Sequence, residues 1–90
     1  MKDKKLKVGR KCFVMVPTYA IHENPHDGYF IDFVDDGVET TWLPAKIVDV
    51  IQTKQYENPY VALSTIPTKE YRFSINVMVS APEVDEYIQF

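Results

Sequence analysis

Apolar residues occupy every second position over several short stretches of this chain, and this alternation constrains the fold more than any other feature. The longest such stretch is residues 71–79, with the sequence YRFSINVMV. It places five large apolar side chains on one face and Arg72, Ser74 and Asn76 on the other. A period of two is typical of half-buried strands, because successive side chains point to opposite faces of a sheet. The pattern predicts a mostly β domain.

Turn signals divide the rest of the chain into shorter segments. The expected strands cover residues 8–16, 29–34, 39–43, 47–51 and 60–63. Asp36-Gly37 predicts a hairpin turn, because this pair tolerates the positive φ angles that tight hairpins require. Pro44 lacks the N–H group that a sheet ladder needs, so we predict a short 3₁₀ turn over residues 44–46. Pro67 is expected to centre another turn, over residues 65–69.

The C-terminal residues have a helix signature. Ser80 and Glu83 have the spacing of a capping box, and Pro82 lies where the first turn would begin. We therefore expect a short helix over residues 82–88, with Val84, Tyr87 and Ile88 facing the core. Together with the strands, this predicts a small twisted barrel or sandwich of five to six antiparallel strands with a short C-terminal helix.

The position of strand 71–79 in the sheet bears on self-association. Edge strands usually carry lysine, proline or a bulge that prevents pairing with another chain. This strand has Arg72 as its only charge, and Met78 adds an apolar side chain to its polar face. We favour a central position for the strand; the alternative is a homodimer that pairs edge to edge and buries Met78.

Length and cysteine content limit the organisation of the chain. Ninety residues suffice for one domain, so we expect a flexible basic leader over residues 1–7 and a single domain over residues 8–90. Cys12 is the only cysteine, which excludes an internal disulfide and favours a reducing compartment. The apolar stretch near the N-terminus is too short for a signal peptide or a membrane span. We expect a soluble, cytoplasmic protein.

The charge is unevenly distributed. Residues 1–11 contain six basic side chains and one acidic side chain, whereas residues 12–90 contain four basic and twelve acidic side chains. An acidic body repels a phosphate backbone, so direct binding of nucleic acid is disfavoured. Such binding would depend on the leader, in which aromatic residues are not interleaved with the lysines.

The acidic residues suggest a binding function, although plain solubility also explains them. Those predicted to form a partner-binding surface are Asp32, Asp35, Asp36 and Glu39. We interpret the chain as a non-enzymatic binding module with a protein partner. One such hypothesis is a phage or mobile-element accessory protein, such as an anti-defence or DNA-mimic inhibitor, whose carboxylates occupy a basic channel intended for phosphate.

A second interpretation comes from residues 28–51. An aromatic strand, an acid–glycine turn, the sequence Trp-Leu-Pro-Ala and a Val-rich strand follow one another here, preceded by a Val-Gly-x-x-Cys element. The matching positions are Tyr29, Ile31, Phe33, Asp36-Gly37, Trp42, Leu43-Pro44-Ala45, Ile47-Val48 and Val8 to Cys12. This arrangement resembles the small β-barrels of the Tudor and Src-homology type.

The resemblance implies a peptide reader. In Tudor-like barrels a cage of aromatic rings binds methylated lysine or arginine through cation–π attraction. The rings that match are Tyr29, Phe33 and Trp42, with Asp32 or Asp35 as the charge partner. The alternative is that these aromatic residues belong to the core, since aromatic side chains dominate the burial energy of small domains.

Few residues point to catalysis or to metal binding. His22 and His26 have the spacing of a helical zinc site, but Pro25 between them argues against a helix. Cys12 is predicted to be a buried, inert thiol, because the basic residue next to it in sequence points to the opposite face of the strand. We therefore expect no enzyme activity, no metal and no cofactor.

Overall fold

The structure is a computed structural model that describes residues 6–21, 37–52, 54–55 and 57–90. Its strands are β1 (Lys11–Pro17), β2 (Thr40–Ile51), β3 (Tyr60–Thr65), β4 (Asn76–Ser80) and β5 (Ile88–Gln89). Its helical segments are the 3₁₀ turns η2 (Thr18–Ala20) and η3 (Ala81–Glu83) and the helix α1 (Val84–Tyr87). The strand expected over residues 29–34 lies outside the described residues. No helix in the described ranges is long and apolar enough to cross a membrane.

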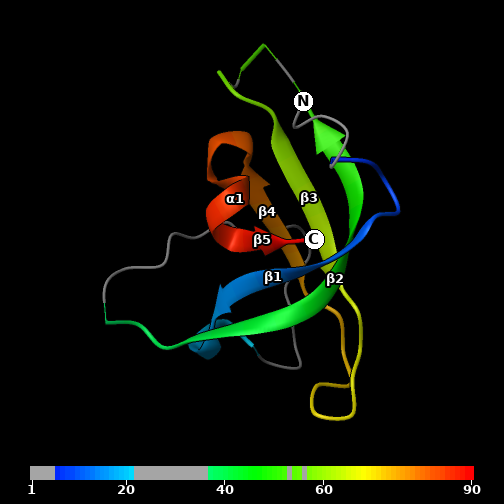
Figure 1. Cartoon of the computed structure of the whole chain (residues 1–90), viewed down its shortest axis with the longest axis vertical. Coiled ribbons are helices and arrows are strands. Elements are labelled where there is room, and N and C mark those ends of the chain that lie inside the picture. The colour runs from blue at the N-terminus through cyan, green and yellow to red at the C-terminus, as the bar shows by residue number, and fades with distance from the viewer. Residues whose placement is uncertain (1–5, 22–36, 53, 56) are drawn as a thin grey trace.

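The five strands form one antiparallel sheet in the order β4-β3-β2-β1-β5. The sheet curls into a half-barrel, and α1 lies across its open side between β4 and β5 (Figure 1). The predicted mostly β fold with a short C-terminal helix is confirmed. The form adopted is a half-barrel rather than a sandwich, because a single sheet curls around one core.

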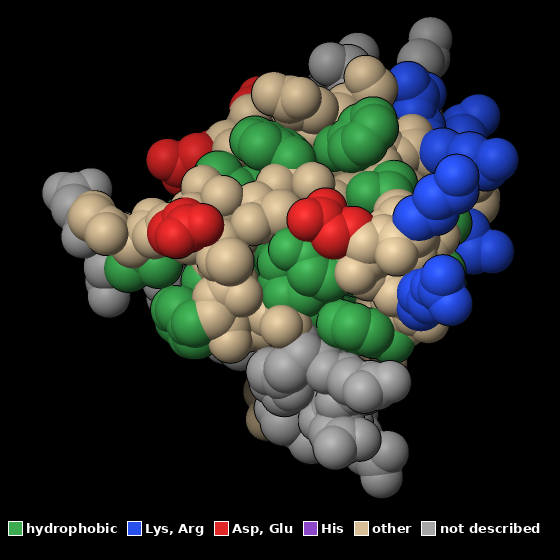
Figure 2. Space-filling view, turned by 90° about the horizontal axis from the view of Figure 1, so that it is seen from below, with side chains coloured by type: hydrophobic (Ala, Val, Ile, Leu, Met, Phe, Trp, Pro, Cys, Tyr) green, Lys and Arg blue, Asp and Glu red, His purple; other side chains and the backbone are tan. Residues whose placement is uncertain are grey.

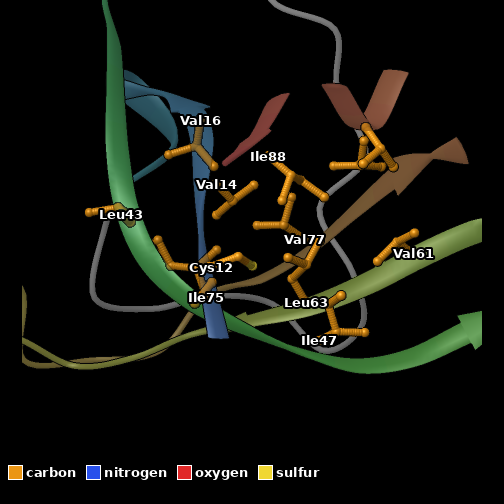
Figure 3. Close-up of a cluster of buried hydrophobic side chains, with 13 residues drawn as sticks. Cys12, Val14, Val16, Leu43, Ile47, Val61, Leu63, Ile75, Val77 and Ile88 are labelled. Carbon is orange, nitrogen blue, oxygen red and sulfur yellow. The ribbon is translucent and has the colours of Figure 1, made fainter. Parts of the chain in front are cut away.

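The core lies inside this curl. Alternate side chains of the strands point inward and are buried, as Figure 3 shows for a cluster that joins every strand. The cluster consists of Cys12, Val14, Val16, Leu43, Ala45, Ile47, Val61, Leu63, Ile75, Val77, Val79, Val84 and Ile88. Nearly all are aliphatic, so burial of apolar surface rather than polar bonding stabilises the half-barrel.

β2 is continuous, so the predicted 3₁₀ turn over residues 44–46 is wrong. Ala45 is the first residue of β2 bridged to β3, and the Pro44 carbonyl accepts a hydrogen bond from the Ile66 amide just beyond the end of β3. The backbone nitrogen of Pro44, which has no hydrogen to donate, also faces the β3 side of β2. The bridged pairs between β2 and β3 have already ended at this position. Proline therefore interrupts no bridged pair of the sheet.

A bulge bends β2 further along. Ile47 pairs with Leu63 and Asp49 pairs with Ala62, so Val48 is the extra residue. The Asp49 carboxylate accepts a hydrogen bond of 2.8 Å from the Val50 amide on the exposed side of the bulge. Bulges increase the local twist of a strand, which lets one long strand take part in both halves of the curl.

β4 is shorter than predicted and lies at the edge of the sheet that the described residues form. Only residues 76–80 pair with β3, so the expected strand over residues 71–79 is wrong in its first half, and within this described sheet it does not take the favoured central position. The predicted faces are nevertheless correct, because Tyr71, Phe73 and Ile75 all contact the core. The ladder ends where the Thr65 hydroxyl accepts a hydrogen bond of 2.7 Å from the Ile75 amide.

The first strand and the C-terminal helix differ from their predicted boundaries by a few residues. β1 begins at Lys11 rather than Val8, because Gly9 adopts a positive φ of 92° in a turn that precedes the strand. The predicted helix over residues 82–88 is a 3₁₀ turn followed by four α-helical residues. The Ser80 hydroxyl does contact Glu83, donating a 2.7 Å hydrogen bond to its carboxylate.

Candidate functional site

Most residues of the two predicted binding sites lie outside the described part of the chain. These are Asp32, Asp35 and Asp36 of the acidic surface, and Tyr29 and Phe33 of the aromatic cage. The acidic surface and the cage therefore stay predictions. The described members are Glu39 and Trp42, which flank the start of β2.

Glu39 and Trp42 are both exposed. The backbone carbonyl of Glu39 accepts a 2.9 Å hydrogen bond from the amide of Thr18, which extends the β1–β2 ladder by one pair. Thr18 and Thr41 share a hydroxyl hydrogen bond of 2.7 Å beside it. Trp42 is 38% exposed and lies opposite Met15, so the ring lies outside the core cluster.

Trp42 belongs to a row of outward-facing side chains on β1 and β2, which we call the outer ladder. Its members form three cross-strand pairs, Lys11 with Lys46, Phe13 with Pro44, and Met15 with Trp42. Along each strand, the residues that alternate with these six belong to the core. Because successive side chains of a strand point to opposite faces, all six side chains point outward. Phe13 is 50% exposed, which leaves two aromatic rings accessible on neighbouring strands.

Two like charges oppose each other in the outer ladder. The Ile47 amide donates a 2.9 Å hydrogen bond to the Arg10 carbonyl, so the next pair, Lys11 with Lys46, is a non-hydrogen-bonded pair with close side chains. Directly opposed like charges destabilise a sheet. Within the described residues, no ion pair with a carboxylate offsets this repulsion.

Two more cations adjoin this end of the outer ladder. The turn formed by residues 7–10 places Lys7 and Arg10 next to β2, because the Gly9 amide donates to the Ile47 carbonyl at 2.7 Å. The Arg10 guanidinium lies 4.9 Å from the centre of the Phe90 ring, within the range of a cation–π contact. Figure 2 shows Lys and Arg side chains gathered at one side of the molecule, next to exposed hydrophobic side chains.

This combination of charge and aromatic rings was missed by the sequence analysis. In the linear sequence no aromatic residue separates the lysines of the leader, so the leader by itself does not indicate such a site. The sheet brings Phe13 and Trp42 to the same face as Lys11 and Lys46. The alternation of residues 11–17 indicates that Lys11 and Phe13 share one face of the strand. Only the register between β1 and β2 shows that Lys46 lies on the same face.

Cys12 is buried in the core cluster, as the sequence predicts. Burial raises the pKa of its thiol, and the nearby charge of Arg10 opposes this only in part. A protonated, inaccessible thiol is a poor nucleophile.

A raised pKa of Cys12 predicts that alkali destabilises the fold. As pH rises through the ordinary thiol range near ~8.5, the unfolded chain loses the thiol proton before the folded chain does, so stability falls. The free energy of unfolding between pH 7 and pH 10 should fall further in the parent than in Cys12→Ala, as measured by urea denaturation. Equal losses in the two proteins would contradict a raised pKa.

The candidate metal ligands gain no support. His22 and His26 lie outside the described residues, and among the residues that are described no group of three His, Cys, Asp or Glu side chains is suited to hold a metal ion. Comparison of the chain with protein families, curated proteins and solved structures gives no match.

Proposed function

We propose that this chain is a non-enzymatic module that binds single-stranded nucleic acid on the outer ladder. The observation that carries the proposal is the opposed pair of lysines, Lys11 and Lys46, on the same face as the exposed rings of Phe13 and Trp42. An anionic ligand between the two ammonium groups would offset the repulsion that they otherwise add to the sheet.

The aromatic rings favour single strands over duplexes. Proteins that bind single strands combine a positive groove for the backbone with rings on which bases stack. The base faces of a duplex are already stacked on one another, so Phe13 and Trp42 can contact only bases that are unpaired. Arg10 precedes Lys11 in sequence, and its guanidinium lies over the Phe90 ring near the same end of β1.

The acidic composition does not oppose this function at physiological salt. The net charge is −3, but charges more than a Debye length away, about 8 Å at 0.15 M salt, are largely screened. A ligand on the outer ladder therefore interacts mainly with the local cations. This differs from the sequence interpretation, in which direct nucleic-acid binding was disfavoured because residues 12–90 carry a net negative charge.

The fluorescence of Trp42, the only tryptophan, tests the proposal directly. We expect a single-stranded oligonucleotide to change this fluorescence, and a duplex of equal length to bind more weakly. The logarithm of the affinity should fall linearly with the logarithm of the salt concentration, by about 0.7 per phosphate contact. The absence of any binding at low salt would contradict the proposal.

Charge reversal locates the binding surface. Lys46→Glu should weaken single-strand binding about tenfold, because it removes one phosphate contact and adds a repulsive charge. Lys54→Glu is the matched control, because Lys54 lies beyond the end of β2. The last residue of β2, Ile51, is about 16 Å along the strand from Lys46. Equal losses in both variants would show that net charge, rather than the outer ladder, determines binding.

A truncation separates the outer ladder from the leader. Residues 1–5 contain three lysines and one aspartate, and their removal leaves Leu6 packed against the core. If the outer ladder binds the ligand, the truncated chain keeps the change in Trp42 fluorescence and loses only part of the salt dependence. Loss of all binding would assign the function to the leader instead.

The resemblance to Tudor and Src-homology barrels remains a proposal about the fold type. It is supported by the curled five-stranded sheet. The match at residues 44–46 does not support it, since that segment is strand rather than a helical turn. A quaternary ammonium ligand that quenches Trp42 would favour the aromatic cage over the nucleic-acid site.

A further inference from the structure

β4 offers an unpaired edge for association with another strand. Among the described strands it ends the strand order and pairs with β3 alone. The Thr65 amide donates to the Ile75 carbonyl, and hydrogen bonding alternates along an antiparallel pair. Ile75, Val77 and Val79 therefore bond to β3, whereas Asn76 and Met78 direct their N–H and C=O groups away from it.

This edge has none of the usual features that prevent pairing. Natural edge strands carry lysine, proline or bulges, or are very short. β4 contains no charged residue and no proline, and its five pairs with β3 are in continuous register. The strand at the opposite edge, β5, has only two residues and is too short to pair stably with another chain. In the described part of the chain, no other segment hydrogen-bonds to the outer edge of β4.

We infer that β4 pairs with β4 of a second copy, antiparallel, around a two-fold axis through Met78. The strand is self-complementary in this register. Met78 meets Met78, and Asn76 of each copy lies opposite Ser80 of the other. The Ser80 hydroxyl already donates to Glu83 and keeps lone pairs that can accept from the Asn76 amide. The chain has a net charge of −3, but β4 contains no charged residue, so no like charges oppose each other between the two β4 strands.

This dimer is independent of the proposed function. β4 is separated from β1 by β3 and β2, so the outer ladder stays accessible in both copies. Each copy contributes the same strand, as a closed two-fold interface requires. Two nucleic-acid sites would then lie on one particle, each on β1 and β2 of its own copy.

The experiment is the molecular mass, measured by light scattering over a range of concentrations. The parent chain should be a dimer, and Met78→Lys should be a folded monomer, because two lysines would face each other at the axis. Met15→Lys is the matched control, since Met15 is also a half-buried, outward-facing methionine but lies within the sheet on β1. It should remain a dimer.

Two mass results overturn the inference: a parent that is monomeric up to about 1 mM, or a dimer that survives Met78→Lys. Amide hydrogen exchange of the parent tests the same interface without a variant. The amides of Val77 and Val79 should be protected at every concentration, because they bond to β3. The Met78 amide should become protected only as the dimer forms, and exchange that is equally fast at high and low concentration rejects the interface.

Discussion

Replacing Leu63 with alanine is expected to lower the free energy of unfolding by about 2–5 kcal/mol. Leu63 is fully buried in β3 and lies between Ile47 of β2 and Val77 of β4 (Figure 3). Its removal leaves a cavity that strands paired on both sides cannot close. A domain of ninety residues has a total stability of roughly 5–13 kcal/mol, so the variant should unfold at a much lower urea concentration.

Ser64→Ala is the control for this prediction. Ser64 is the next residue of β3 and is half-buried on the outer face, opposite Lys46 and Asn76. Its truncation should change the free energy of unfolding by less than about 0.5 kcal/mol. Similar losses for both variants would mean that β3 is not the middle of the core.

Thr65→Val is expected to cost about 1–3 kcal/mol of stability. Thr65 is the one buried polar residue in the described ranges, and its hydroxyl accepts a 2.7 Å hydrogen bond from the Ile75 amide. Valine has a similar shape but cannot accept a hydrogen bond, so the buried amide would be left without a partner. Urea denaturation measures the loss.

Thr65→Ser separates the hydrogen bond from the packing of this side chain. Serine keeps the hydroxyl and removes one methyl group, so it should cost about 1 kcal/mol or less. A serine variant that is less stable than the valine variant would show that the methyl group, rather than the hydroxyl, anchors residue 75 to β3.

The sequence predicted the fold class because alternation depends only on the side-chain period of a strand. In β1, residues Cys12, Val14 and Val16 face the core, as their spacing indicates. Alternation also gave the correct faces for residues 71–75, which are not part of a strand. An apolar period of two indicates which side chains are buried, but it does not indicate whether the backbone forms hydrogen bonds with a neighbouring strand.

Strand order and proline placement could not be predicted in the same way. Pro44 is acceptable in β2 because the β2–β3 ladder ends next to it, and that depends on the position of Ile66. The edge position of β4 likewise depends on the pairing of all the other strands. The outer ladder was missed for the same reason, since the register that joins Lys11 to Lys46 is a property of two strands.

The pairing of β5 with β1 has a consequence for how the domain folds. Phe13 and Val14 pair with Gln89 and Ile88, so strands from the two ends of the described sequence meet in one ladder. The hairpins of β2, β3 and β4 join residues that are much closer in sequence and can form earlier. Contacts between distant residues have the largest loop-closure cost and slow folding. We expect the β1–β5 contact to be among the last to form, so that Ile88→Val mainly speeds unfolding and leaves the folding rate nearly unchanged.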